Sequence, residues 1–78
     1  MQNFEPHEVK LANEIADTLK DRNSLALFLT YAHKYKEQFL RDILAQVMSI
    51  DQAKIRRSRG ALFTFLVNQH GAHGHSRS

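Results

Sequence analysis

Hydrophobic residues in the first half of the chain recur every three to four positions, which is the spacing of one face of an α-helix. Pro6 suits the first turn of a helix, where its missing N–H is not needed. The pattern therefore predicts a helix over residues 6–21. Its stripe consists of Val9, Ala12, Ile15, Ala16 and Leu19.

The next hydrophobic block, residues 25–35, covers most of the circumference of a helix. Helices of that kind are usually central and buried, so this one is expected to form the core. Asn23 or Ser24 can cap its start. Residues 33–38 then interrupt the pattern without a Pro or Gly, so one bent helix is an alternative. A break near Lys36 is favoured because the stripe changes phase there, and His33 is expected to be exposed.

The second half of the chain predicts further helices. A clean stripe covers residues 39–48, and Ser49 to Gln52 contains capping residues before a helix over 51–59. Residues 61–67 are expected to be helical, although their aromatic and β-branched content would also suit a strand if a partner strand existed. Gly71 is expected to end this helix in the left-handed conformation.

These elements predict one small all-α domain. It is expected to be a compact bundle of four short helices, or five if Gly60 splits the last one, and to contain a helix-turn-helix-like pair. The domain should cover residues 1–69. Residues 70–78, which contain His, Gly and Ser and no hydrophobic pattern, should form a flexible tail.

The composition excludes several classes of protein. The 78 residues contain no cysteine, so disulfides and thiolate metal sites are ruled out. Hydrophobic residues make up 42%, too many for a disordered chain. The N-terminus does not resemble a signal peptide, and no run approaches the roughly 20 apolar residues that cross a membrane. A cytoplasmic protein without a membrane partner is expected.

Positive charge is concentrated near the C-terminus. Residues 1–55 hold seven Lys and Arg and eight acidic residues, for a net charge of −1. Residues 56–78 hold four Arg and no acid, for a net charge of +4. Arg56, Arg57 and Arg59 fall within four positions. Such a cluster can neutralise phosphates, or it can be a solvated helix turn.

The stretch from Leu44 to Arg57 reads L-A-Q-V-M-S-I-D-Q-A-K-I-R-R. It resembles the helix-turn-helix core of many bacterial DNA-binding proteins. Their pattern is Leu-Ala, two variable residues, Leu-Gly, Val or Ile, a Ser or Thr cap, three variable residues, Val or Ile, then polar or basic residues. The resemblance covers residues 41–60. The chain departs from it at Ser49, where the family usually has Gly, and at Ser58, where it usually has an apolar residue.

The resemblance implies how such a protein would act. Ala45 would lie where the two helices cross, Ile50 would plug the turn and Ile55 would anchor the second helix. That helix would enter the major groove of double-stranded DNA, where Gln can read adenine and Arg can read guanine. The leading hypothesis is a small DNA-binding regulator, or a replication or mobile-element accessory factor, acting as a homodimer. Its expected nucleic-acid contacts are Gln52, Ala53, Lys54, Arg56, Arg57 and Arg59.

The alternative is a helical protein–protein interaction module, such as an adaptor or a regulatory inhibitor. The last helix is more apolar than one buried face requires, and exposed apolar patches mark interfaces. A second copy or a larger partner is expected to contact Leu62, Phe63, Phe65, Leu66 and Val67. The arginine cluster would then meet an acidic protein surface.

The sequence does not suggest an enzyme. No nucleophile–base arrangement or phosphate-binding glycine loop stands out, so neither catalysis nor a cofactor is expected. His70, His73 and His75 lie in the glycine-containing tail, which offers no fixed geometry, so no metal site is expected either.

Overall fold

The computed structural model describes residues 4–71, and this part of the chain folds into helices joined by short connections. It contains four α-helices: α1 (Pro6–Leu19), α2 (Leu25–Lys34), α3 (Glu37–Ser49) and α4 (Arg59–Gly71). Two single turns of 3₁₀-helix precede α2 and α4: η1 (Arg22–Ser24) and η2 (Gln52–Lys54). Residues 4–71 contain no strand. The all-α bundle of four short helices is confirmed, and residues 61–67 are helical.

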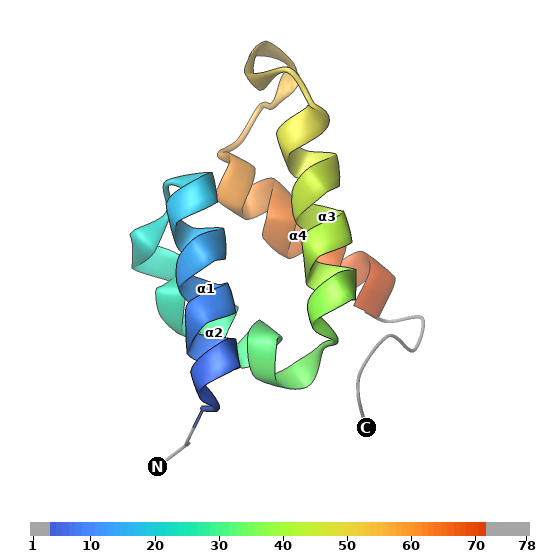
Figure 1. Ribbon diagram of the computed structural model, residues 1–78. Helices are drawn as coiled ribbons and strands as arrows, with labels where there is room; N and C mark the ends of the chain where they lie inside the picture. Colours follow the sequence, from blue (N-terminus) through green and yellow to red (C-terminus); the bar gives the residue numbers. More distant parts are fainter. Residues whose placement is uncertain (1–3, 72–78) are drawn as a thin grey trace.

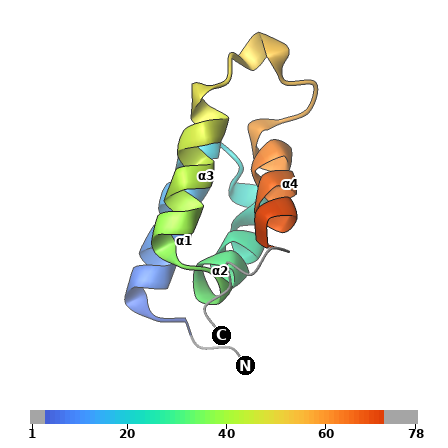
Figure 2. The ribbon, with the colours of Figure 1, turned by 90° about the vertical axis from the view of Figure 1, so that its right-hand side faces the viewer.

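The helices form two hairpins that pack against each other. Figure 1 shows α1 and α2 side by side, with α3 and α4 on the opposite side of the molecule. In the turned view of Figure 2, α3 is seen in front of α1, and a loop at one end of the bundle joins α3 to α4. No helix within residues 4–71 is long and apolar enough to cross a membrane.

Most helix boundaries follow the sequence prediction, and two details differ. The break near Lys36 is confirmed, because Tyr35 and Lys36 both have extended backbone conformations between α2 and α3. The left-handed residue is Lys20, with φ of 55°, so α1 ends before the predicted residue 21. The prediction of a left-handed Gly71 was wrong, because Gly71 is the last residue of α4 and has no such backbone angle. A Cβ there would lie 2.5 Å from the Tyr35 hydroxyl, so glycine allows α4 to approach Tyr35.

The core lies where the two hairpins meet. Phe28 of α2 and Phe63 of α4 are fully buried and pack edge to face, with ring centroids 5.6 Å apart. Burial raises the pKa of Tyr31, more strongly than its hydrogen bond with Asn68 lowers it. The largest fully buried aliphatic side chains come from α1, α3 and α4: Ile15, Leu40, Val47 and Val67.

Several of the predicted hydrophobic positions are not in the core, including Met48 at the end of the 39–48 stripe. Leu27 is substantially exposed, so α2 buries one face rather than its whole circumference. Val9, at the start of the α1 stripe, is also exposed. Ala45 is exposed rather than at a helix crossing, because α3 faces the core through Leu40, Ile43 and Val47.

Polar contacts cap the start of α1 and join α1 to α2 and to α3. The buried Glu8 accepts a hydrogen bond from the backbone N–H of Glu5 and pairs with Nδ1 of His33 at 3.2 Å. His33 itself is exposed, as predicted. Arg41 pairs with Glu37 on its own helix and with Glu14 of α1, at 2.6 and 3.1 Å. Two of these contacts therefore link different helices.

The α-helix predicted over residues 51–59 does not form. Only Gln52–Lys54 make one 3₁₀ turn, after which Ile55 is extended and the chain bends before α4 begins at Arg59. Asp51 caps the short turn, and the Ser58 hydroxyl accepts a hydrogen bond from the N–H of Ala61, so Ser58 caps α4. Too few residues lie between these two caps to support a helix without a buried apolar face.

The predicted tail is only partly described. His70 and Gly71 lie inside α4, so the helical domain extends past residue 69, where it was expected to end. Residues 72–78, including His73 and His75, lie outside the described residues.

Candidate docking groove

The loop between α3 and α4, residues 50–58, projects from one end of the bundle. Figures 1 and 2 both place it beyond the ends of the other helices. Its local hydrogen bonds are short-range: the N–H of Lys54 donates to the carbonyl of Asp51, and that of Ile55 donates to Gln52. At the base of the loop, Nη2 of Arg59 donates to the carbonyl of Ile50 at 3.2 Å. Arg59 thereby joins the start of α4 to the end of α3.

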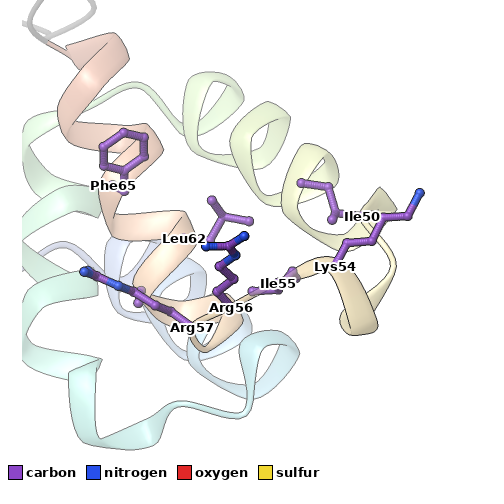
Figure 3. Close-up of a pocket in the computed structure, with 8 residues that line it drawn as sticks. Ile50, Lys54, Ile55, Arg56, Arg57, Leu62 and Phe65 are labelled. Atoms are coloured by element: carbon purple, nitrogen blue, oxygen red, sulfur yellow. The ribbon is translucent and has the colours of Figure 1, made fainter.

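An open groove of about 460 Å³ separates this loop from the N-terminal half of α4. Its apolar lining comes from Ile50 and Ile55 on the loop side and from Leu62 and Phe65 on α4 (Figure 3). Phe65 is 60% exposed, the most exposed of the large hydrophobic residues in the described part of the chain. The groove therefore presents an apolar surface to solvent in the isolated chain.

The charged residues of the groove all have the same sign. Lys54, Arg56 and Arg57 line it, and its lining contains no acidic residue. In the view of Figure 3, Arg56 lies beside Leu62, and Arg57 extends toward the side of the view where Phe65 lies. The nearest acid in the sequence, Asp51, accepts a hydrogen bond from the N–H of Ala53. Cationic side chains thus border an apolar floor.

The residues expected to contact nucleic acid are brought together, but on a loop rather than a helix. Five of the six are exposed: Gln52, Ala53, Lys54, Arg56 and Arg57. Arg59 is half-buried, and its Nε is buried without a hydrogen-bond partner within residues 4–71. It holds the base of the loop instead of projecting from it.

The residues expected to form a protein interface divide into two groups. Phe65 is exposed, and Leu62 and Leu66 are half-buried. Phe63 and Val67 are fully buried in the chain's own core, so their assignment to an interface was wrong. They point inward because α4 packs one face against the other helices. Ile50 and Ile55 also line the groove, although the sequence analysis treated them as internal supports of a helix pair.

No site for a metal is apparent in the described part of the chain. Residues 4–71 contain no cluster of three or more His, Asp or Glu side chains that could hold an ion. The lining of the groove itself offers apolar and cationic side chains.

Comparisons with known proteins do not assign a family. No protein-family model, curated protein or solved structure matches the chain.

Proposed function

We propose that this protein is a protein-interaction module that binds an acidic, amphipathic segment of a partner protein in the groove between the 50–58 loop and α4. One observation carries the proposal: an apolar floor that includes the exposed Phe65 is bordered by three cations and no acid. A partner segment that contains both apolar and acidic residues would complement this lining.

The apolar floor would supply most of the affinity. Fully burying a Phe side chain contributes roughly 1.5–3 kcal/mol. Phe65 is 60% exposed, so covering it recovers a large part of that value. Aromatic anchors surrounded by less critical contacts are typical of binding hot spots.

The cations would supply specificity and a faster association rate. Lys54, Arg56 and Arg57 are exposed, so each pairing with a partner carboxylate is worth little by itself. Together they favour acidic segments over basic ones and accelerate association, and both effects weaken as salt increases. Binding should therefore combine a salt-sensitive component with a salt-insensitive apolar one.

Duplex DNA remains the alternative ligand from the sequence prediction. The exposed cations of the loop suit phosphates. However, the segment expected to read the major groove is a 3₁₀ turn followed by the extended Ile55 and a bend. A DNA complex would also leave the apolar floor without a specific role. These two observations favour a protein ligand.

The test compares two classes of ligand on the same protein. Fluorescence anisotropy measures the binding of a labelled peptide with alternating Leu and Glu residues and, separately, of a labelled random-sequence DNA duplex. Three control peptides replace all Leu with Ser, all Glu with Gln, or all Glu with Lys. We expect the Leu/Glu peptide to bind most tightly and the DNA to bind only weakly at low salt.

Variants connect binding to the groove. Phe65→Ala should weaken peptide binding about tenfold at every salt concentration, the equivalent of about 1.4 kcal/mol. Arg56→Ala/Arg57→Ala should weaken it mainly at low salt. Lys10→Ala/Lys36→Ala removes the same charge from exposed positions away from the loop and serves as the matched control. Tight DNA binding that is lost in the arginine variant and unaffected by Phe65→Ala would overturn the proposal.

A further inference from the structure

A second groove, of about 440 Å³, lies beside the first at the N-terminal turns of α4. The two grooves share Arg57, Ala61 and Phe65, so these residues form the ridge between them. The rest of the second lining is polar or small and comes from the α1–α2 connection, the end of the 50–58 loop and α4: Asp21, Ser24, Ser58, Gly60 and Thr64. The docking surface therefore continues past the apolar floor into a polar region.

Asp21 is the acidic residue of the second groove, and the shared Arg57 is its basic one. The Asp21 side chain lies directly against Gly60, where a Cβ would lie 3.0 Å from the Asp21 Cγ. Glycine at this position thus lets α4 approach the carboxylate. Asp21 does not cap η1 with its side chain, and within residues 4–71 the carboxylate forms no ion pair or hydrogen bond. It is half-buried, so it remains partly accessible to a ligand.

An acidic residue joins the lining only past the ridge, where Asp21 lies opposite the shared Arg57. Lys54 and Arg56 line only the first groove, Arg57 lines both, and Asp21 lines only the second. A segment lying along this surface would meet cations first and then a carboxylate. An oppositely charged partner is favoured at each position, and a like charge is disfavoured.

We infer that the two grooves form one docking surface, and that the partner segment carries a basic residue next to its acidic, amphipathic block, placed to pair with Asp21. The inference rests on the proposed function and specifies the partner further. The acidic block occupies the first groove, and the segment then crosses the ridge of Arg57 and Phe65. The basic residue lies in the second groove, among the hydroxyl groups of Ser24 and Thr64.

The experiment is a double-mutant cycle between peptide and protein. The Leu/Glu peptide is extended by a short Gly-Ser spacer that ends in Lys, in Gln or in Glu. Each extension is made at the N-terminus of the peptide and, in a second set, at its C-terminus. Both directions in which the segment can lie along the surface are thereby tested. All peptides are titrated against the wild-type protein and against Asp21→Asn.

In one of the two extension directions, the terminal residue of the peptide should be coupled to Asp21. There the Lys peptide should bind wild type about two- to fivefold more tightly than the Gln peptide, as expected for a partly exposed ion pair, and the Glu peptide should bind more weakly. Asp21→Asn should remove the preference for Lys while leaving the affinity for the Gln peptide unchanged. The next residue in the chain, Arg22, is basic, so no adjacent acid replaces the charge that the substitution removes.

The cycle separates a contact from a structural role, because a destabilised groove would weaken all peptides equally. Thermal unfolding of Asp21→Asn checks its fold, and Asp42→Asn, at an exposed position of α3 outside both grooves, is the matched control. Equal affinities for Lys and Gln peptides in both directions would overturn this inference while leaving the proposed function intact. If the unextended Leu/Glu peptide itself does not bind, the proposed function fails.

Discussion

Arg59 is expected to hold the groove open by fixing the base of the loop. Its Nη2 donates to the carbonyl of Ile50 at 3.2 Å, which joins the end of α3 to the start of α4. A hydrogen bond to a charged group contributes about 1.5–3 kcal/mol, and this one is at the long end of the normal range. Because the side chain is only half-buried, we expect Arg59→Met to lower the free energy of unfolding by about 1–2 kcal/mol.

Arg59→Met isolates the contact well. Met and Arg have similar helix propensities, so the change should not weaken α4 by itself. For a domain of this size, each 1 kcal/mol shifts the melting temperature by about 4–8 °C, which circular dichroism measures easily. Arg59→Lys keeps the charge and a donor, and should retain part of the stability.

Hydrogen exchange gives a local measurement. The N–H groups of Lys54 and Ile55 donate within the loop, so they should exchange faster in Arg59→Met, whereas those of the α1 core should change only with global stability. The peptide affinity should fall while its salt dependence stays the same, because Arg59 acts through loop position. A stability loss below about 0.5 kcal/mol, with unchanged exchange at Lys54 and Ile55, would refute this role.

Three further predictions concern stability. Phe63→Ala should cost about 3–5 kcal/mol in chemical denaturation, while Phe65→Ala, at an exposed position, should change stability by less than about 0.5 kcal/mol. Since burial raises the pKa of Tyr31, the unfolded state releases the phenol proton first; stability should fall as pH rises above about 10, and Tyr31→Phe should flatten that part of the profile. Gly60→Ala should destabilise the fold by crowding Asp21, and Asp21→Ala should partly relieve the loss in a double-mutant cycle.

Helix positions were predictable where one apolar face had to be buried. The α3 stripe gave Leu40, Ile43 and Val47 correctly, since each lies at helical spacing and each is buried. The same pattern could not tell that α2 leaves Leu27 exposed. Which side of a strongly apolar helix faces solvent depends on the neighbours that pack against it, and their arrangement is not encoded in the local period.

The groove could be predicted only in part. The sequence places Arg56 and Arg57 just before the apolar residues of the last helix, because charge and hydropathy are local properties. It did not predict that Ile50 and Ile55 would line a groove with Leu62. That depends on the loop turning back toward α4, and a contact between such distant parts of the chain has no local signature.

The loop also explains why the helix prediction failed at the place where the candidate site lies. A helix over residues 51–59 would bring Lys54 and Arg57, and Arg56 and Arg59, into like-charged pairs three residues apart, which disfavour helix. It would offer little besides Ile55 to bury. The loop instead turns Ile55 toward the groove and leaves Ser58 free to cap α4. The cations that disfavour a helix over residues 51–59 are thus the same side chains that border the apolar floor of the groove.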